Sequence, residues 1–560
     1  MLSLPCMAEE TISFDINGLK EEMLKNANTR LGILLENIGT PLTVNGTIEF
    51  YQKAPENIRE AIQPFGYFHA KISQHIIKHN SHTYFHFNVV LGIPIRISKI
   101  TLLLIGAGKN NTLLNKALLD FPLKKDQILQ TADYEKFKRQ WFNLALEEGY
   151  LNAFFAAREI RINTKKNTAV IILSLDTGQR YYFGSVTFKP IFLSESLLRR
   201  YIPFQEGQPF SSQKLANFQQ ILSSTPYFQQ VSIENSTPQK QTHIVPISVN
   251  LTLKKAKEYL AGIGYGTDTG PRLTAGVNVR YLNPEGHYLK TLLIASSIQN
   301  SLQAAYFIPG KNPATDKYSL NTSLTQNNLE QGTSRTAQLG ANYIHIQKNN
   351  WERTLSLNYT VEQFKFNNAP FQISHLLVPG IRYQYLSSND PVFPTQGQRF
   401  SVELKGAPQI NFASISDTSF LQSLVQEKYI THFTDNNRLI LQVNAGYTVV
   451  HDLNVFPLSL QFYSGGAQSV RGYSYQSLGP GRYLLTTSAE FQQRIKDQWY
   501  GAIFYDAGNA ANTLDLELKR GAGIGIVWVS PIGKIELTLA KALSVPGQPN
   551  RIQFTMGADL

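Results

Sequence analysis

From about residue 256 onward, apolar and polar residues alternate along short segments that are separated by Gly, Pro, Asn and Asp. Strict alternation is typical of a β-strand with one apolar and one polar face, and the turn residues mark the strand ends. Lys534 to Leu539 is an example, because its Ile and Leu residues occupy one face and its Lys, Glu and Thr residues the other. Arg399 to Lys405 repeats this pattern. The second half of the chain is therefore predicted to be a meander of antiparallel strands.

Alternation alone does not say whether the apolar face of this meander meets a protein core or lipid, since a soluble β-sandwich shows the same alternation. The final alternating segment, Arg551 to Leu560, runs to the last residue of the sequence, and an unpaired edge of this kind invites aggregation. A closed barrel with lipid outside and water inside removes the edge. The 304 residues from 257 to 560 divide into about 16 strands of about 19 residues with their connections. A transmembrane antiparallel barrel of about 16 strands is therefore predicted.

The first half of the chain contains an internal repeat. Tyr67, Tyr150 and Tyr227 each follow a helical pattern and open an extended segment, and they lie 83 and 77 residues apart. Within each repeat the periodicity predicts the order strand, helix, helix, strand, strand. Each repeat is expected to be a small α+β domain whose edge strands can accept a partner strand. The expected divisions are 11–96, 97–179 and 180–255 for the three domains and 256–560 for the barrel.

Several helix boundaries in the repeats can be predicted from single residues. In the first repeat, a helical pattern covers Leu19 to Ile38, and Pro55 is expected early in a second helix, where a missing N–H is tolerated. Asp133 is a candidate N-cap in the second repeat, and Ser211 or Ser212 is one in the third.

Composition limits how the chain can cross a membrane. Apolar residues make up 42% of the sequence, yet no uninterrupted apolar stretch approaches the ~18 residues of a transmembrane helix. Any crossing is therefore expected to be made by strands, which need only about 9 to 11 residues each. Cys6 is the single cysteine, so no disulfide forms within the chain. Residues 1–10 are expected to be a leader remnant or a tail.

The net charge of +12 does not identify a partner, because Lys and Arg are scattered and form no dense run. Nucleic-acid binding is therefore not expected. No His-Glu-x-x-His or Gly-x-Ser-x-Gly motif occurs, so an enzyme is not expected, and neither catalytic residues nor a cofactor nor a metal site is expected. Two glycine runs, at 262–266 and 521–525, are expected to clear room inside the barrel or to let strands bend.

Two motifs near the end of the chain carry a resemblance to a known family. The first is Val470-Arg471-Gly472-Tyr473, flanked by glycines between two predicted strands, and the second is Phe504-Tyr505-Asp506-Ala507-Gly508-Asn509. In this order they resemble the Val-Arg-Gly-Phe/Tyr and aromatic-x-Asp-x-Gly signatures of the outer-membrane assembly superfamily that includes BamA, TamA and FhaC. The three repeats resemble the TamA branch in particular, since BamA typically has five and FhaC two.

The resemblance implies three POTRA domains followed by an outer-membrane barrel, with the loop that carries the first motif folded back into the barrel. A buried Arg471 would be costly without a carboxylate on the inner wall. Gly472 is expected to let the loop bend where a side chain would clash. The wall residues expected from the family pattern are Asp506, Glu490 and Gly508.

The same resemblance implies that the first and last barrel strands meet in a lateral seam that opens toward lipid. Glycines in the first strand would weaken that seam. A client strand could then add to the opened edge by main-chain hydrogen bonds, which requires no hydrolysis. The expected seam residues are Glu258, Gly262, Gly264 and Gly266 on the first strand and Phe554, Gly557 and Leu560 on the last.

The implied function is that of the outer-membrane component of a translocation and assembly module, which inserts or translocates autotransporter and other β-barrel proteins. The implied partners are a TamB-like inner-membrane-anchored protein, unfolded outer-membrane or autotransporter clients, and outer-membrane lipid. The implied location is the outer membrane of a Gram-negative bacterium, with the POTRA domains in the periplasm. A two-partner-secretion-like polypeptide pore and a passive porin are the alternatives.

Overall fold

A computed structural model describes residues 11–39, 43–79, 82–235, 241–266, 270–367, 369–409, 418–530 and 533–557. Residues 1–10, the expected leader remnant or tail, and Leu560 lie outside the described residues. In the described part of the chain, no helix is both long and apolar enough to span a membrane. The chain divides into two compact units, one of residues 1–187, 203–219 and 233–249, the other of residues 188–202, 220–232 and 250–560.

The first small domain is a three-stranded sheet with two helices packed on it. Its central strand β3 is parallel to β1 and antiparallel to β2. Phe50 of α2 packs edge-on against Phe85 of β3, with ring centres 4.9 Å apart, and both rings are fully buried. The elements are β1 (Thr11–Asn17), α1 (Glu21–Ile38), α2 (Val44–Ile62), β2 (Lys71–His79) and β3 (His82–Val90).

The expectation that Pro55 lies near the start of the second helix is wrong. Helix α2 begins eleven residues earlier at Val44, because the hydroxyl of Thr43 accepts a hydrogen bond from the backbone N–H of Gly46 and caps the helix. Pro55 therefore lies in the interior of α2.

The second small domain repeats this plan, with one helix, α4, packing an aromatic ring into the core. Trp141 of α4 is buried in that core and donates its ring N–H to the backbone oxygen of Leu114 at 3.2 Å. Asp133 is not the N-cap, because α4 already begins at Thr131 and Asp133 lies in its first turn. The elements are β4 (Arg96–Ile105), α3 (Thr112–Leu119), α4 (Thr131–Glu147), β5 (Phe154–Asn163) and β6 (Thr168–Asp176), with sheet order β4-β6-β5.

The third small domain has the sheet order β7-β9-β8. Ser211 caps α6, since its hydroxyl accepts a hydrogen bond from the N–H of Lys214 at 3.4 Å, as the sequence predicts. In all three domains the order strand, helix, helix, strand, strand is confirmed, and the last strand lies in the middle of the sheet. The elements are β7 (Tyr182–Phe188), α5 (Glu195–Arg199), α6 (Ser212–Ser223), β8 (Phe228–Asn235) and β9 (Ile244–Leu253).

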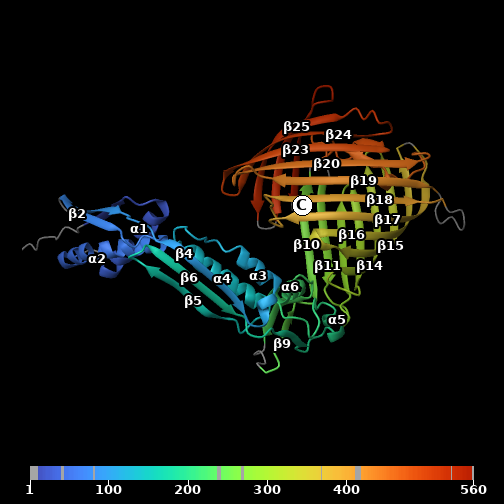
Figure 1. Cartoon of the computed structure of the whole chain (residues 1–560). Coiled ribbons are helices and arrows are strands. Elements are labelled where there is room, and N and C mark those ends of the chain that lie inside the picture. Colours follow the sequence, from blue (N-terminus) through green and yellow to red (C-terminus); the bar gives the residue numbers. More distant parts are fainter. Residues whose placement is uncertain are drawn as a thin grey trace, which may run out of the picture. The chain divides into compact units, whose positions relative to one another are not determined.

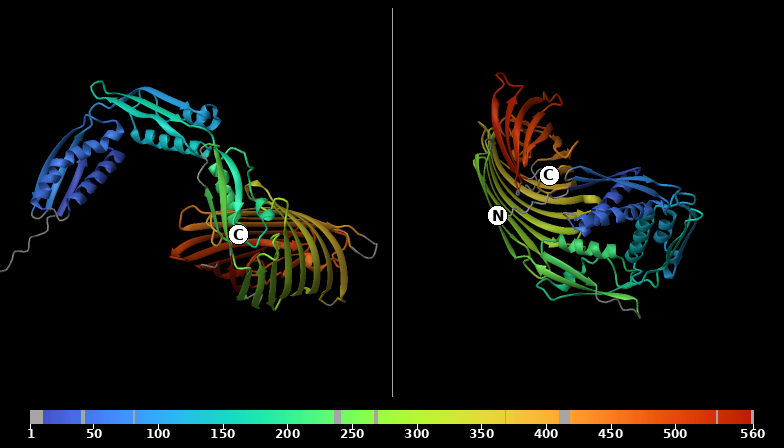
Figure 2. Two further views of the ribbon diagram at one scale, coloured as in Figure 1. Left: turned by 90° about the horizontal axis from the view of Figure 1, so that it is seen from below. Right: turned by 90° about the vertical axis from the view of Figure 1, so that its left-hand side faces the viewer.

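Within the described residues, the second half of the chain forms one antiparallel sheet of 16 strands, and the predicted number is confirmed. Figures 1 and 2 show these strands side by side, curving into a barrel. The strands are β10 (Lys257–Gly266), β11 (Gly270–Val279), β12 (Tyr288–Ser296), β13 (Gln299–Pro309), β14 (Asp316–Leu329), β15 (Gly332–Ile346), β16 (Trp351–Phe366), β17 (Gln372–Ser388), β18 (Gly397–Ala407), β19 (Phe420–Thr431), β20 (Asn437–Val450), β23 (Tyr483–Lys496), β24 (Trp499–Ala511), β25 (Lys519–Ser530), β26 (Gly533–Ala542) and β27 (Asn550–Gly557).

The two faces of the barrel wall differ in polarity as the alternation predicts. On β26, Leu537 and Leu539 are 50% and 47% exposed, whereas Glu536 and Thr538 between them are only 5% and 4% exposed. Aliphatic side chains therefore face outward, and polar ones face the lumen. This is the arrangement of a barrel with a lipid-facing exterior and a polar interior.

The barrel has two distinct ends. The end at which β10 begins is called here the domain end, and the opposite end is called the loop end. Because successive strands are antiparallel, the connection between β17 and β18 lies at the domain end, and the connection between β20 and β23 lies at the loop end.

Candidate functional site

The connection between β20 and β23, residues 451–482, is the central feature of the barrel interior. It contains two short paired strands, β21 (Phe462–Ser464) and β22 (Leu478–Gly481). Near its start, Ser459 donates both its N–H and its hydroxyl to the carboxylate of Glu362, a buried residue of β16, with an N–O distance of 3.0 Å for the first bond. Gln422 of β19 donates to the backbone oxygen of Leu460 at 2.8 Å. These contacts fix the start of the loop to the inner wall.

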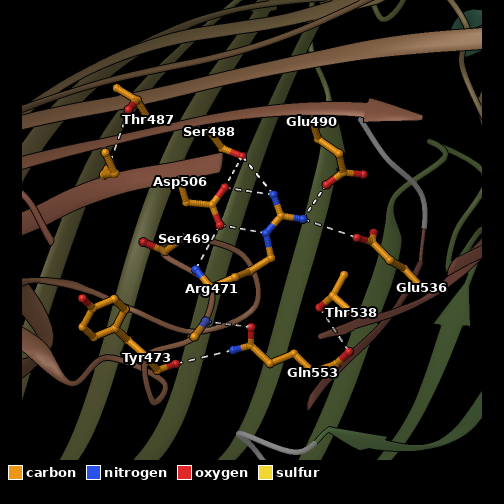
Figure 3. A network of polar contacts seen from close by, with 12 residues as sticks. Ser469, Arg471, Tyr473, Thr487, Ser488, Glu490, Asp506, Glu536, Thr538 and Gln553 are labelled. Carbon is orange, nitrogen blue, oxygen red and sulfur yellow. Dashed lines mark hydrogen bonds and ion pairs between the residues drawn. The ribbon is translucent and has the colours of Figure 1, made fainter. Parts of the chain in front are cut away.

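Further along the loop, Arg471 reaches the wall formed by β23, β24 and β26. Its Nε and Nη2 atoms donate to the two carboxylate oxygens of Asp506 on β24, at 2.8 and 2.9 Å. Its backbone N–H donates to the same carboxylate at 3.0 Å. Figure 3 shows this paired arrangement, in which Ser488 of β23 also donates to Asp506 at 2.7 Å. The carboxylate therefore fixes both the side chain and the backbone of the loop.

Two further carboxylates surround the same guanidinium group. Nη1 of Arg471 donates to Glu490 of β23 and, at 3.4 Å, to Glu536 of β26. The second oxygen of Glu536 pairs with Lys534 at 2.7 Å. The guanidinium carbon also lies 3.4 Å from the ring centre of Phe504, so a cation–π contact adds to the ion pairs.

The charged side chains of this cluster are buried, so each depends on the others for its stability. Asp506 is 0% exposed, and Glu490, Glu536 and Arg471 are 5 to 6% exposed. An ionised side chain out of contact with water is costly, and the planar guanidinium is suited to pairing with a carboxylate through two parallel hydrogen bonds. Loss of one partner would leave the others as uncompensated buried charges. The structure thus brings Arg471 together with both wall carboxylates foreseen from the sequence.

The other residues of the first motif place the loop backbone. Val470 is fully buried and packs with Tyr473 and Ala542. Gly472 has φ of +91°, and a Cβ atom there would lie 2.9 Å from the backbone nitrogen of Ala542. The sequence-based reason for this glycine, a bend in crowded surroundings, therefore matches the structure.

Glycines of the wall have two separate roles. A Cβ atom at Gly521 of β25 would lie 2.0 Å from the backbone oxygen of Arg471, so this glycine makes room for the loop, as expected. Gly508 is expected among the wall partners of Arg471, but a Cβ atom there would lie 2.7 Å from the backbone oxygen of Leu485 on the neighbouring strand. Its role is to let β23 and β24 approach closely.

The tip of the loop is also bound to the last strand, β27. Gln553 is 1% exposed, accepts a hydrogen bond from the N–H of Gly472 at 3.3 Å, and donates to the backbone oxygen of Tyr473 at 3.4 Å. Arg551 donates to the hydroxyl of Ser474 at 2.8 Å. The loop is therefore attached to one of the two strands that end the sheet.

The two terminal strands, β10 and β27, stand at the opposite ends of the strand order, and the described residues record no hydrogen-bonded pairing between them. A cavity of about 370 Å³ is lined by Gly264 of β10, by Phe554 and Thr555 of β27, and by loop residues that include Tyr463 and Ser469. Gly266 and Gly557 end these two strands.

Of the seam residues on β10, Glu258 is in an ion pair, whereas Gly262 and Gly264 are not crowded by neighbouring atoms. Glu258 is paired with Arg280 at 2.6 Å and accepts a hydrogen bond from Asn278 at 3.0 Å. No atom lies within 4 Å of a Cβ atom built at Gly264, and at Gly262 only Thr274 comes as close as 3.8 Å. These two glycines therefore do not clear room for the loop, and the alternative, that they let the strand bend, stays a prediction.

A second polar cluster lies toward the domain end. The turn of residues 389–396 is braced by Asp390, whose carboxylate accepts the N–H groups of Val392 and Phe393 at 2.8 Å each. The ring centre of Phe393 lies 3.7 Å from the guanidinium carbon of Arg438 on β20, which is fully buried, and 5.2 Å from the ring centre of Tyr500 on β24. The turn thus reaches side chains of strands to which it is not connected.

The cluster around Arg471 and the cluster around Arg438 are linked through side chains of β23. Gln492 lies opposite Arg438 in the strand register and donates to Glu490 at 2.6 Å, and Glu490 also binds Arg471. The lumen face of β23 therefore connects the two ends of the barrel.

Sequence reasoning missed Glu536, Glu362 and Gln553. A signal existed for Glu536 and Gln553, because both lie on the polar face of an alternating strand. That pattern does not say which polar residue of the wall meets the loop. Glu362 lies far along the chain from Ser459, and nothing local indicates their contact.

Comparisons with known proteins support a common architecture. The family model described as "Omp85 superfamily domain" matches residues 263–560. "POTRA domain TamA domain 1" matches residues 13–90, and the POTRA family "Surface antigen variable number repeat" matches residues 181–264.

Individual relatives are more distant. The outer membrane protein assembly factor BamA of Nitratidesulfovibrio vulgaris is 20% identical over 486 residues, which cover 79% of this chain and 60% of that protein. BamA of Buchnera aphidicola is 24% identical over 164 residues, 29% of this chain and 26% of that protein. The chain therefore spans at most 60% of the length of these two relatives.

Two solved structures share the fold. BamA of Haemophilus ducreyi lacking POTRA domains 1-3 has a TM-score of 0.68 and 19% identity, covering 83% of this chain and 99% of that chain. CdiB of Acinetobacter baumannii has a TM-score of 0.50 and 12% identity, covering 83% of this chain and 90% of that chain.

Proposed function

We propose that this chain, which belongs to the Omp85 superfamily, inserts or translocates autotransporter and other β-barrel polypeptides by opening its barrel laterally between β10 and β27. POTRA-type domains followed by a 16-stranded barrel provide the parts that such an activity needs: sheet edges that bind extended chains, and a wall that can part into lipid. The likeness of the first domain to the TamA profile and the presence of three such domains favour the outer-membrane component of a translocation and assembly module.

The observation that carries this proposal is the attachment of residues 451–482, called here the arginine loop, to the seam between β10 and β27. Arg471 binds Asp506 on the wall, and two residues further along, Tyr473 is bound by Gln553 of β27. The loop therefore fixes β27 against the interior wall. Movement of the loop would free one side of the seam, and the strand edges of β10 and β27 would become available.

An opened seam can pair with a client strand without hydrolysis of a nucleotide. Each terminal strand presents a row of N–H and C=O groups, and in hydrocarbon such groups must be paired. A client strand that pairs with this edge satisfies its own backbone at the same time. The free energy comes from hydrogen bonding and burial in lipid, so no catalytic residue is required.

The residues that fill the lumen argue against a passive porin. The arginine loop occupies the interior between β16 and β26, and the turn of residues 389–396 reaches β20 and β24 toward the domain end. A wide constant pore is therefore not the function these contacts favour.

The proposed location is the outer membrane, with the three POTRA domains in the periplasm. Each domain has two sheet edges, because its last strand is central. These edges would receive unfolded clients by strand addition. A TamB-like inner-membrane-anchored protein is the proposed partner.

Reconstitution tests the proposal. The full chain is inserted into liposomes, an unfolded autotransporter β-domain is added, and its folding is measured by heat modifiability and protease resistance. We expect wild-type liposomes and those with Arg399→Ala, an exposed arginine of β18, to fold the client. Arg471→Ala should reduce the folding rate. Folding no faster than in empty liposomes for the wild type would contradict the proposal.

A further inference from the structure

We propose a binding site for a divalent transition-metal ion on the open face of the first domain's sheet, formed by His75 of β2 and His86 of β3. This site goes beyond the proposed function and departs from the expectation of no metal site. Four histidines lie in one hairpin at a symmetric spacing, with three, two and three residues between them: His75, His79, His82 and His86.

The strand register turns this spacing into two cross-strand pairs. His75 is opposite His86, and His79 is opposite His82. The neighbours Phe85 and Phe87 on β3 are buried in the core beneath the helices, so His86 between them lies on the opposite, open face. His86 and its register partner His75 are thus not core residues of the hairpin.

The described pair has a geometry that suits one shared ion. The ring centres of His75 and His86 are 6.2 Å apart, with an angle of 35° between the rings. Residues directly opposite in an antiparallel pair have Cβ atoms about 4.5–5.5 Å apart, and a Zn–N bond measures about 2.0–2.1 Å. Small rotations of the two side chains would therefore bring one nitrogen of each ring to a common ion.

Asp15 of β1 orients one of these rings. It lies opposite His86 in the parallel register, and its carboxylate pairs with Nδ1 of His86. Asn17 donates to the other carboxylate oxygen at 3.1 Å and holds it in place. A neutral imidazole that donates its Nδ1–H to a carboxylate keeps Nε2 unprotonated, which is the common arrangement of metal-binding histidines. The geometry thus leaves Nε2 of His86 available as a ligand.

The ligand set favours particular ions. Among the described side chains, no group of three or more His, Cys, Asp or Glu residues is placed to enclose an ion. Two imidazoles with water or a partner's donor in the remaining positions suit Cu²⁺, Ni²⁺ or Zn²⁺, whereas Ca²⁺ and Mg²⁺ prefer oxygen ligands. In the usual order of stability, Cu²⁺ would bind more tightly than Zn²⁺.

The test uses the full chain in detergent after removal of metals, titrated with Cu²⁺ alone. Calorimetry measures the affinity, and electron spin echo spectroscopy detects the coordinating imidazole nitrogens. We expect one site with two imidazoles that is lost in His75→Ala and in His86→Ala. Asp15→Asn should keep both nitrogens but weaken binding by about tenfold. His451→Ala, an exposed histidine of the barrel loop, should bind like the wild type.

Two results would overturn the site. Unchanged affinity and unchanged imidazole signals in His75→Ala and His86→Ala would show that Cu²⁺ binds elsewhere. Loss of the site in His79→Ala or His82→Ala, with both other variants unaffected, would place it at the hairpin tip. Circular dichroism of each variant, compared with the wild type, separates loss of ligands from loss of folding.

Discussion

The α-carbon of Gly521 lies directly against the main chain of Arg471, so close that a Cβ atom at position 521 would be 2.0 Å from the arginine's backbone oxygen. No real Cβ atom tolerates such a contact, and the neighbour here is backbone that cannot rotate away. The barrel wall therefore provides both space for the loop, at Gly521, and carboxylates that pair with Arg471. Seating of the loop depends on both features.

Gly521→Val should displace the loop while leaving its ion-pair partners intact. The expected result is slower client folding and greater accessibility of a cysteine placed at Ser474, measured by maleimide labelling. Gly501→Val on β24 is the matched control, because a Cβ atom there would meet only the flexible side chain of Ile495, at 3.3 Å. Equal labelling of the two variants would show that the contact does not seat the loop.

Asp506→Ala should unseat the loop more strongly than any other single wall substitution. It removes two hydrogen bonds to the guanidinium group and one to the backbone N–H of Arg471, and it leaves a buried cation with a weakened set of partners. Removal of one member of a buried ion pair typically costs about 3–5 kcal/mol. Client folding and the temperature of heat modification should both fall. Asp435→Ala, an exposed acid of the β19–β20 turn, should leave both unchanged.

Much of this site could be predicted because its main residues lie in two short sequence motifs. Alternation predicts the wall. The resemblance to the superfamily signatures implies a buried Arg471, which requires an acid on the wall, and it implies Asp506 as that acid, with Glu490 as a second candidate. The contacts of Glu362 and Gln553 could not be predicted, because they depend on which wall strand a 32-residue loop meets after crossing the lumen. Pro55 misled for a local reason, since the hydroxyl of Thr43 supplies a cap that starts the helix earlier.

Gln553→Leu should separate the loop from the seam without removing a charge. The substitution deletes the hydrogen bonds to Gly472 and Tyr473 and leaves the Asp506 pair in place. Spin labels on the loop and on β27 should then show a broader distance distribution, and the rate of client folding should fall, as for the other variants that unseat the loop. A distribution identical to that of the wild type would mean that the loop does not hold β27. Asn550→Leu, at the start of the same strand, serves as the control.

Phe393→Ala should loosen the domain end of the barrel. The ring covers the fully buried Arg438 and contacts Tyr500, so its loss removes a cation–π contact worth about 0.5–2 kcal/mol. The expected result is a larger and noisier single-channel conductance in planar bilayers. Phe433→Ala, an exposed ring of the neighbouring domain-end turn, should conduct like the wild type. Equal conductance of the two variants would show that the turn does not restrict the lumen.

Lateral opening is tested most directly by locking the seam. Cysteines replace Gly264 of β10 and Thr555 of β27, which line the same cavity, Cys6 is replaced by serine, and a short cleavable bifunctional reagent joins the pair. A pair at Gly264 and Arg272, register partners on β10 and β11, is locked as the control. The locked seam should abolish folding of an autotransporter client, cleavage of the reagent should restore it, and the control should remain active. Client folding at the wild-type rate through a locked seam would contradict lateral opening.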